Sequence, residues 1–127
     1  MVLVGFTLFK EKILDGTKTQ TIRKMRSRPF ITGDTLHLYW KTRTPQCELL
    51  KITKAKEVFN LYVTFYDDRV KFERKTWKGI KELTAIEVNR IALKDGFDSA
   101  QEMSDWLYET HGTKDYGSIQ LFQVIRW

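Results

Sequence analysis

The stretch Gly16-Thr17-Lys18-Thr19-Gln20-Thr21-Ile22-Arg23 is the part of this sequence around which the rest is organised. It begins with a glycine that can end a helix, and its β-branched residues favour an extended backbone. No acidic residue occurs between Asp15 and Asp34, whereas that interval holds five basic residues: Lys18, Arg23, Lys24, Arg26 and Arg28. Elsewhere the chain mixes both signs of charge. We therefore expect this stretch to line a site for an anionic or polar ligand.

The composition is that of one folded domain spanning residues 1–127. Hydrophobic residues make up 42% of the chain and aromatic residues 13%, which is enough to build a core without disulfides. No internal repeat, linker or low-complexity segment marks a domain boundary.

Several classes of protein are disfavoured by what the sequence lacks. No apolar run approaches the roughly 18 residues that a membrane span needs, and Met1–Gly5 has none of the features of a signal peptide. Cys47 is the single cysteine, and together with two histidines it provides too few ligands for an ordinary zinc site. We expect a cytoplasmic protein that uses no metal, cofactor or membrane. The sequence does not indicate an oligomeric state.

The formal net charge of +6 points to an anionic partner, with nucleic acid as the first candidate. Basic residues are concentrated between Lys18 and Arg28 and again between Arg69 and Lys81. We therefore expect RNA or a nucleoside as the partner.

Hydrophobic periodicity predicts one short helix and several strands in the first part of the chain. Phe9–Asp15 fits a helix in which Phe9, Ile13 and Leu14 share one face and which ends at Gly16. The strands are expected at Val2–Phe6, from Thr19 onward, and at Thr35–Trp40, Cys47–Lys56, Val58–Phe65 and Val70–Glu73, with a hairpin turn at Asp67-Asp68 before the last.

Two helices and a closing strand are predicted after Ile80. Capping boxes at Thr84–Glu87 and Ser99–Glu102 open the helices, which end at Gly96 and at His111-Gly112. The residues expected to face inward are Ile86, Val88, Ile91, Ala92, Met103, Trp106 and Leu107. Ile119–Trp127 is expected to be a buried strand paired with an early one. This order predicts an α+β domain, namely a small, mostly antiparallel β-barrel with two or three helices packed alongside.

The arrangement of these motifs resembles the ASCH domain family. The resemblance is carried by Ile13-Leu14-x-Gly16-x-Lys18-Thr19-x-Thr21-Ile22-Arg23, by Gly33-Asp34 at the start of a strand, and by Ala92-x-x-Asp95-Gly96-Phe97-x-Ser99. It covers nearly the whole chain in the same order, and the segment Tyr62–Lys81 is the part that it does not place. It implies a PUA-like β-barrel with a cleft that binds RNA.

One branch of that family, the small bacterial acetylcytidine amidohydrolases, uses a lysine, a threonine and a glutamate for catalysis. The resemblance places the lysine and the threonine at Lys18 and Thr21. It places the glutamate at Asp95, where this chain has the shorter acid. Glu87 is a second candidate for that role.

Amide hydrolysis needs a nucleophile, a base and a group that stabilises the oxyanion. Thr21 can serve as the nucleophile and Lys18 as the base, provided that burial or a neighbouring cation such as Arg23 lowers the lysine pKa. Asp95 can then orient Lys18 or activate water. In a regular strand Lys18 and Thr21 point to opposite faces, so they share a site only if Lys18 lies in the preceding loop. Thr19, Thr21 and Arg23 would then line one face.

Further basic and aromatic residues are candidates for contacts with nucleic acid. We expect Lys24, Arg26 and Arg28 to contact phosphate rather than bases. Tyr39 can stack on a base, or it can cover a second layer of core. Trp77, which is flanked by lysines, is either a platform for a nucleobase or an anchor for its own loop.

The leading hypothesis is a domain that binds RNA or a nucleoside in a cleft lined by Lys18, Thr21, Arg23 and Asp95. The alternatives are a small amidohydrolase acting on an acylated pyrimidine nucleoside such as acetylcytidine, a ribonuclease, and a module that binds protein.

Overall fold

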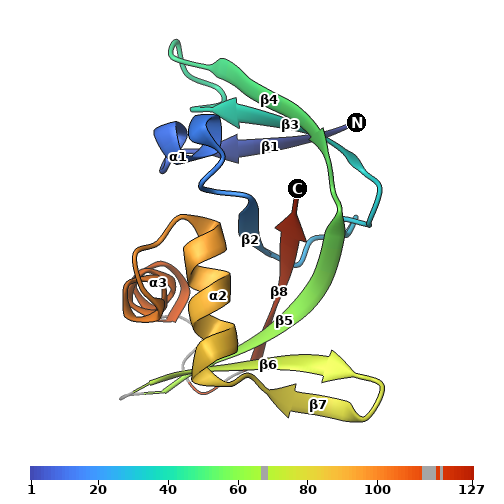
Figure 1. The fold of residues 1–127 in the computed structure, drawn as a ribbon, viewed down its shortest axis with the longest axis vertical. Helices are drawn as coiled ribbons and strands as arrows, with labels where there is room; N and C mark the ends of the chain where they lie inside the picture. Colours follow the sequence, from blue (N-terminus) through green and yellow to red (C-terminus); the bar gives the residue numbers. More distant parts are fainter. Residues whose placement is uncertain (67–68, 113–116, 118) are drawn as a thin grey trace.

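The computed structural model of the protein describes residues 1–66, 69–112, 117 and 119–127. Over these residues the chain forms eight strands and three α-helices (Figure 1). The strands are β1 (Val2–Phe6), β2 (Gln20–Lys24), β3 (Thr35–Trp40), β4 (Glu48–Lys54), β5 (Glu57–Phe65), β6 (Val70–Thr76), β7 (Gly79–Glu82) and β8 (Ile119–Arg126). The helices are α1 (Lys10–Asp15), α2 (Ala85–Asp95) and α3 (Ala100–Leu107), and α3 continues into one wider turn, η1 (Tyr108–Gly112).

The strands form two sheets. The smaller has the order β1-β3-β4, with β1 parallel to β3 and β3 antiparallel to β4. The larger has the order β2-β8-β5-β6-β7 and is antiparallel throughout. The predicted pairing of the closing strand with an early one is confirmed, because β8 lies between β2 and β5.

The two sheets are joined along one continuous path. Strands β4 and β5 follow each other as a single long arc (Figure 1). Between them, the backbone N–H of Lys56 donates to Arg126 and that of Ala55 donates to Asp34. At the same end of β8, the N–H of Trp127 donates to the carbonyl of Thr19. The α+β class is therefore confirmed, and the described strands form two sheets without closing into a barrel.

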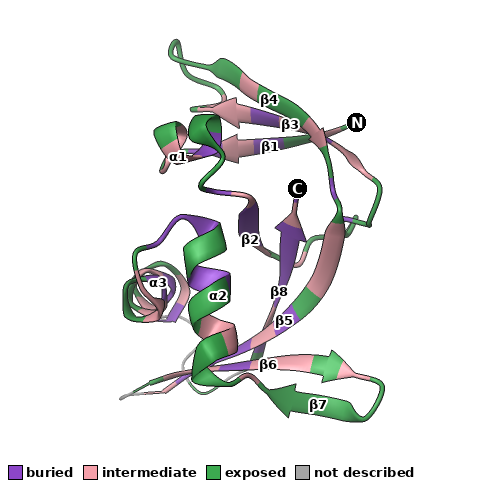
Figure 2. Ribbon diagram, viewed as in Figure 1, coloured by how far each residue is buried: buried purple, intermediate pink, exposed green. Residues whose placement is uncertain are grey.

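The buried residues form two apolar cores (Figure 2). The first core lies between the larger sheet and helices α2 and α3, and its fully buried members include Leu61, Met103 and Phe122. The second lies beneath α1 and the smaller sheet, around Ile13 and Leu36. The cavity described below is lined by residues of both cores.

The helix caps follow the sequence closely. At α2 the capping box is complete, because Thr84 and Glu87 exchange hydrogen bonds between side chain and backbone. At α3 only half of the predicted box forms: Ser99 accepts from Glu102, whose carboxylate instead accepts from the N–H of Asp98. None of the described helices has the length and apolarity required to cross a membrane.

Some of the predicted faces differ from those observed. Ile86 and Leu14 are exposed by 66% and 53%, because the apolar stripes of their short helices are narrower than the periodicity implied. Strand β7 was not predicted, since all four of its residues are exposed and its sequence carries no apolar alternation. The predicted turn at Asp67-Asp68 lies outside the described residues.

Two glutamines on β8 have opposite hydrogen-bonding status although both are buried. The Gln123 side chain donates to the carbonyl of Phe30 and accepts from its N–H, at 3.0 and 2.8 Å, which ties the chain after β2 to the central strand. The side chain of Gln120 has no hydrogen-bond partner among the described residues. A polar side chain that is buried without a hydrogen-bond partner lowers the stability of the fold.

This contrast predicts that the substitution of glutamine by leucine lowers stability at position 123 but not at position 120. Gln123→Leu should lower the free energy of unfolding by about 2 kcal/mol, because two buried backbone groups of Phe30 lose their partner. Gln120→Leu should leave it unchanged or raise it. Urea unfolding of both variants beside the wild type measures the difference, and equal losses at the two positions would contradict this account.

Candidate functional site

A cavity of about 300 Å³ lies between the loop after β1, strand β2, the end of α2 and the turn after α3. Its polar lining includes Lys18, Thr21, Arg23 and Asp95. Its apolar lining includes the rings of Phe6, Phe9, Phe97 and Trp106. The four residues of the leading hypothesis are thus brought together in one place.

The local backbone explains why Lys18 and Thr21 share this cavity. Gly16 ends α1 in the left-handed region with φ of 85°, a conformation that glycine adopts without strain. The N–H of Lys18 then donates to Lys12, and β2 begins only at Gln20. Lys18 therefore lies in the loop, as the alternation of side chains required, and Thr21 and Arg23 line the cavity from the strand. Thr19 is half-buried and does not line it.

Lys18 and Asp95 form a buried ion pair at the end of α2. The ammonium lies 3.3 Å from Oδ2 of Asp95, and the exposed fractions of the two residues are 3% and 6%. Lys18 also donates to the backbone carbonyl of Asp95 and lies 5.6 and 5.5 Å from the rings of Phe6 and Phe9. A carboxylate is unfavourable at the C-terminal end of α2, where the helix dipole is negative. The Lys18 ammonium is favourable there and offsets this cost.

Burial perturbs both members of this pair. It lowers the pKa of Lys18, and the neighbouring charge of Asp95 opposes that change. It raises the pKa of Asp95, against the influence of Lys18 and Gln20. Both charged forms are thus less favoured than in water, which is common among groups that transfer protons.

Gln20 is a functional candidate that the sequence reasoning missed. It is fully buried, and its Nε2 donates to the carbonyl of Ile91 at 2.9 Å and to Oδ1 of Asp95 at 3.3 Å. Its Oε1 accepts from Nε of Arg126 at 2.9 Å. Gln20 therefore fixes the carboxylate from the side away from Lys18. The alternation along β2 was the available signal, because it turns Gln20 away from Thr21 and towards α2.

Arg23 lines the cavity from β2 and is held by three contacts. Its Nε donates to Oγ1 of Thr21 at 3.0 Å, and its Nη2 donates to the carbonyl of Gly5 at 2.6 Å. The guanidinium carbon lies 4.9 Å from the centre of the Phe6 ring. Burial lowers the pKa of Arg23, partly against the attraction of Asp95.

The aromatic lining includes one strained residue and one histidine. Phe9 has φ of 65°, which is rare for a bulky side chain and which places its ring against the cavity and 5.2 Å from Phe97. His111 lines the cavity from η1, with its ring 6.2 Å from Trp106 and 5.1 Å from Phe122. From sequence, His111 was expected to do no more than end a helix, because the wider turn that aims it inward has no recognisable pattern.

The other predicted residues lie in different places. Lys24 lines the cavity rim. Arg26 stacks on Phe30 and donates to the carbonyl of Arg28, both arginines being exposed and outside the lining. Tyr39 is half-buried in β3, and Trp77 lies in the β6–β7 turn. Their contacts with nucleic acid stay predictions.

The two candidate acids lie at opposite ends of α2. Glu87 caps the start of α2, whereas Asp95 ends that helix beside Lys18. Eight residues of α-helix separate them by about 12 Å. Asp95 is therefore the acid that can act with Lys18.

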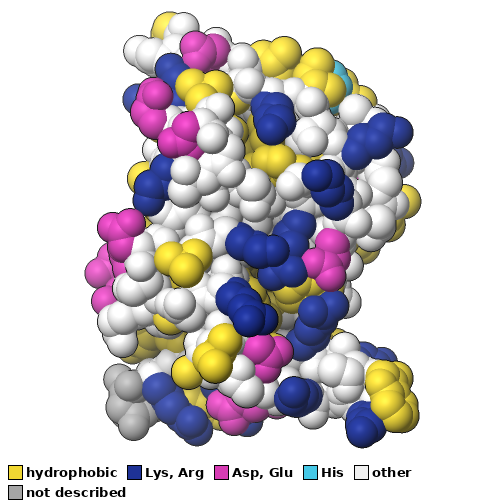
Figure 3. All heavy atoms as spheres, viewed as in Figure 1, with side chains coloured by type: hydrophobic (Ala, Val, Ile, Leu, Met, Phe, Trp, Pro, Cys, Tyr) yellow, Lys and Arg dark blue, Asp and Glu magenta, His cyan; other side chains and the backbone are white. Residues whose placement is uncertain are grey.

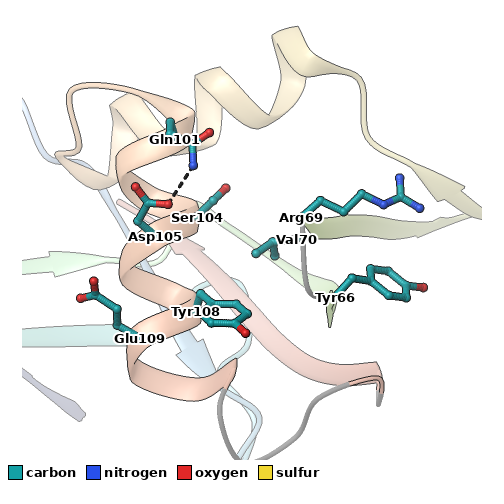
Figure 4. A pocket seen from close by; sticks show the side chains of 8 residues that line it. All are labelled: Tyr66, Arg69, Val70, Gln101, Ser104, Asp105, Tyr108 and Glu109. Carbon is teal, nitrogen blue, oxygen red and sulfur yellow. Dashed lines mark hydrogen bonds between the residues drawn. The ribbon is translucent and has the colours of Figure 1, made fainter.

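A second cavity, of about 370 Å³, has a different character (Figure 4). Ser104, Asp105 and Tyr108 line it on the side of α3 and η1, and Tyr66, Arg69 and Val70 line it on the side of β5 and β6. None of the residues predicted for the site lines it. Among the residues that the structure describes, no group of His, Cys, Asp or Glu could hold a metal ion.

Comparison with protein-family models finds no match, and neither the curated proteins nor the solved structures include one that matches.

The buried ion pair predicts a large cost for removing one partner. Lys18→Met should lower the free energy of unfolding by about 3–5 kcal/mol near neutral pH, because the Asp95 charge is left buried and unpaired. The double variant Lys18→Met/Asp95→Leu should recover most of that loss. Urea unfolding of Lys18→Met, Asp95→Leu and the double variant tests this coupling. A loss in the double variant equal to the sum of the two single losses would contradict it.

The same variant should respond to pH in a defined direction. Without Lys18 the pKa of Asp95 in the folded state lies above its unfolded value of about 3.9. The buried charge then imposes its full penalty at pH values above the folded pKa, and this penalty is lost as the pH falls from the folded pKa to the unfolded one. The stability gap between Lys18→Met and wild type should therefore narrow from about pH 7 to about pH 4.

Proposed function

We propose that the cavity binds a nucleobase or nucleoside, either free or as an unstacked base of RNA. The observation that carries this proposal is the combination of aromatic rings with a few fixed polar groups around one small cavity. Phe6, Phe97 and Trp106 offer faces and edges for a planar ring, while Thr21 and Arg23 offer hydrogen bonds at its rim. A volume of about 300 Å³ lies at the lower end of the usual range for ligand pockets.

We further propose that the chain is a cytoplasmic domain of the ASCH type, built on a PUA-like barrel. The resemblance rests in part on the motif from Gly16 to Arg23, three of whose polar residues, Lys18, Thr21 and Arg23, line the cavity. The two joined sheets are compatible with a barrel that is open on one side. RNA or a nucleoside is the corresponding partner, and the domain needs no cofactor for binding.

A second candidate function is the hydrolysis of an acyl group from a pyrimidine nucleoside such as acetylcytidine. The specific support is the lowered pKa of Lys18, which raises the fraction of neutral amine that can act as a base. In this scheme Thr21 Oγ1 attacks the acyl carbonyl, and Lys18 accepts the hydroxyl proton and returns it to the leaving amine. Water then hydrolyses the acyl-enzyme. Arg23 stabilises the oxyanion, and Asp95 positions the lysine.

The binding proposal predicts a pocket-specific loss of affinity that depends little on salt. Cytidine should bind the wild type, and Thr21→Val should weaken binding about fivefold, because the loss of one hydrogen bond costs about 1 kcal/mol. Arg28→Ala, outside the cavity, serves as the matched control. Calorimetric titration at two salt concentrations measures both effects. Equal affinities in all three proteins, or no binding by folded wild type, would contradict the proposal.

The hydrolase proposal predicts release of cytidine from acetylcytidine. Thr21→Val should abolish turnover, and the wild-type rate should rise with pH as Lys18 loses its proton, with a midpoint below the usual lysine pKa of about 10.4. Chromatography follows the product, and a labelled oligoribonucleotide in the same assay reports any ribonuclease activity. Turnover that survives both Thr21→Val and Lys18→Met would exclude this catalytic set.

A further inference from the structure

A basic groove runs along α2 and the β6–β7 hairpin, separate from the cavity around Lys18. It consists of two neighbouring hollows of about 190 and 260 Å³, which share Arg74, Leu83 and Glu87 in their linings. One hollow continues to Arg126 on β8, and the other continues to Trp77 in the hairpin turn. Neither hollow shares a lining residue with the Lys18 cavity.

The charge of this groove is strongly one-sided. Its lining holds five basic residues, Arg74, Lys75, Lys81, Arg90 and Arg126, against the single acid Glu87. Figure 3 shows Lys and Arg side chains gathered across the middle of this face and down towards β6 and β7. Glu87 accepts from the N–H of Thr84 and its charge also acts on Lys81 and Arg74, and Glu57 pairs with Arg126 and Arg74 at 2.7 and 3.9 Å. Two acids thus face five basic residues, so the groove keeps a net positive charge. A polyanion is therefore the favoured occupant.

Aromatic residues interrupt the basic ones. The ring of Phe59 lies 3.9 Å from the guanidinium carbon of Arg74 and 5.0 Å from that of Arg126, and Glu57 bonds Arg126 at 2.7 Å. These contacts hold both guanidinium groups in the groove. At its far end Trp77 is 90% exposed, with the Lys78 ammonium 4.9 Å from its ring.

The exposure of Trp77 has no structural explanation within the described residues. Strand β7 is exposed at every position, and Ile80 beside the turn is 57% exposed, so the hairpin end covers no core. The sequence left open whether Trp77 anchors its loop, and its exposure argues against that role. An exposed indole among cations is the arrangement on which single-stranded bases stack.

We propose that this groove binds single-stranded RNA, with Arg74, Lys75, Lys81 and Arg90 contacting phosphates and Trp77 stacking on a base. The proposal does not depend on the ligand of the Lys18 cavity, because the two sites share no residue. Phosphate contacts supply affinity that falls with salt, and stacking tolerates any base. The Tyr62–Lys81 segment, which the family resemblance did not place, thereby acquires a function.

The test is a titration of a fluorescently labelled twelve-nucleotide oligouridylate with the whole chain, followed by anisotropy at several salt concentrations. The triple variant Lys75→Gln/Lys81→Gln/Arg90→Gln should bind more weakly and with a salt dependence smaller by about 2 in logarithmic slope, since each lost contact removes about 0.7. The control Arg43→Gln/Lys51→Gln/Lys54→Gln removes the same charge from exposed positions in and around β4. Binding by this control should change little.

Trp77→Ala should reduce affinity about tenfold without changing the salt slope, because stacking releases no counterions. Its exposure means that the substitution leaves the fold intact, and urea unfolding checks this. Equal binding of oligothymidylate would support a groove for single strands of either kind. No binding of oligouridylate, or equal losses in the two triple variants, would overturn the proposal.

The two sites can fail separately in these experiments. Thr21→Val should weaken cytidine binding, and in its background the groove triple variant should still lower oligouridylate affinity and the salt slope by the same amounts as in the wild type. Cytidine binding without oligonucleotide binding would refute the groove and leave the cavity. The reverse result would refute the cavity and leave the groove.

Discussion

The buried pair of Lys18 and Asp95 is the constraint on which the architecture of the site depends. It joins the loop after α1 to the last residue of α2, and Gln20 extends the connection into the first position of β2. Moving both charges out of water costs several kcal/mol per ion, and a well-packed apolar pair would serve stability as well or better. The presence of such a pair beside an open cavity is therefore better explained by a role in ligand binding or proton transfer than by a contribution to stability.

Much of the fold was predictable because its signals are local. Gly16 ends a helix, Thr84 and Glu87 cap one, and Leu36 to Trp40 alternate as a half-buried strand should. The juxtaposition of Lys18 with Thr21 could be stated only as a condition on where β2 begins. Gln20 and His111 escaped prediction because their roles depend on which tertiary surface they meet. The exposure of Ile86 and Leu14 has the same origin, since a periodic pattern does not reveal how much of a face is covered.

Arg126 connects the two proposed sites through hydrogen bonds. It lines the basic groove, stacks on Phe59 and bonds Glu57, while its Nε donates to Gln20. Gln20 in turn donates to Asp95, which pairs with Lys18. An unbroken series of polar contacts therefore crosses the larger sheet and the edge of α2. Each member is at least partly buried, which gives these bonds more strength than exposed ones would have.

The position of β8 also has a consequence for how the chain folds. This strand lies between β2 and β5 in the larger sheet, and the β2 residues with which it pairs lie about a hundred positions earlier, as in the pairing of Gln20 with Arg126. The chain must lose much conformational entropy before contacts so distant in sequence can form and stabilise the fold. Proteins rich in such contacts therefore fold slowly. The smaller sheet and the α2–α3 pair consist of nearer neighbours. The domain is thus expected to complete its cavity in the same late step that inserts β8 between β2 and β5.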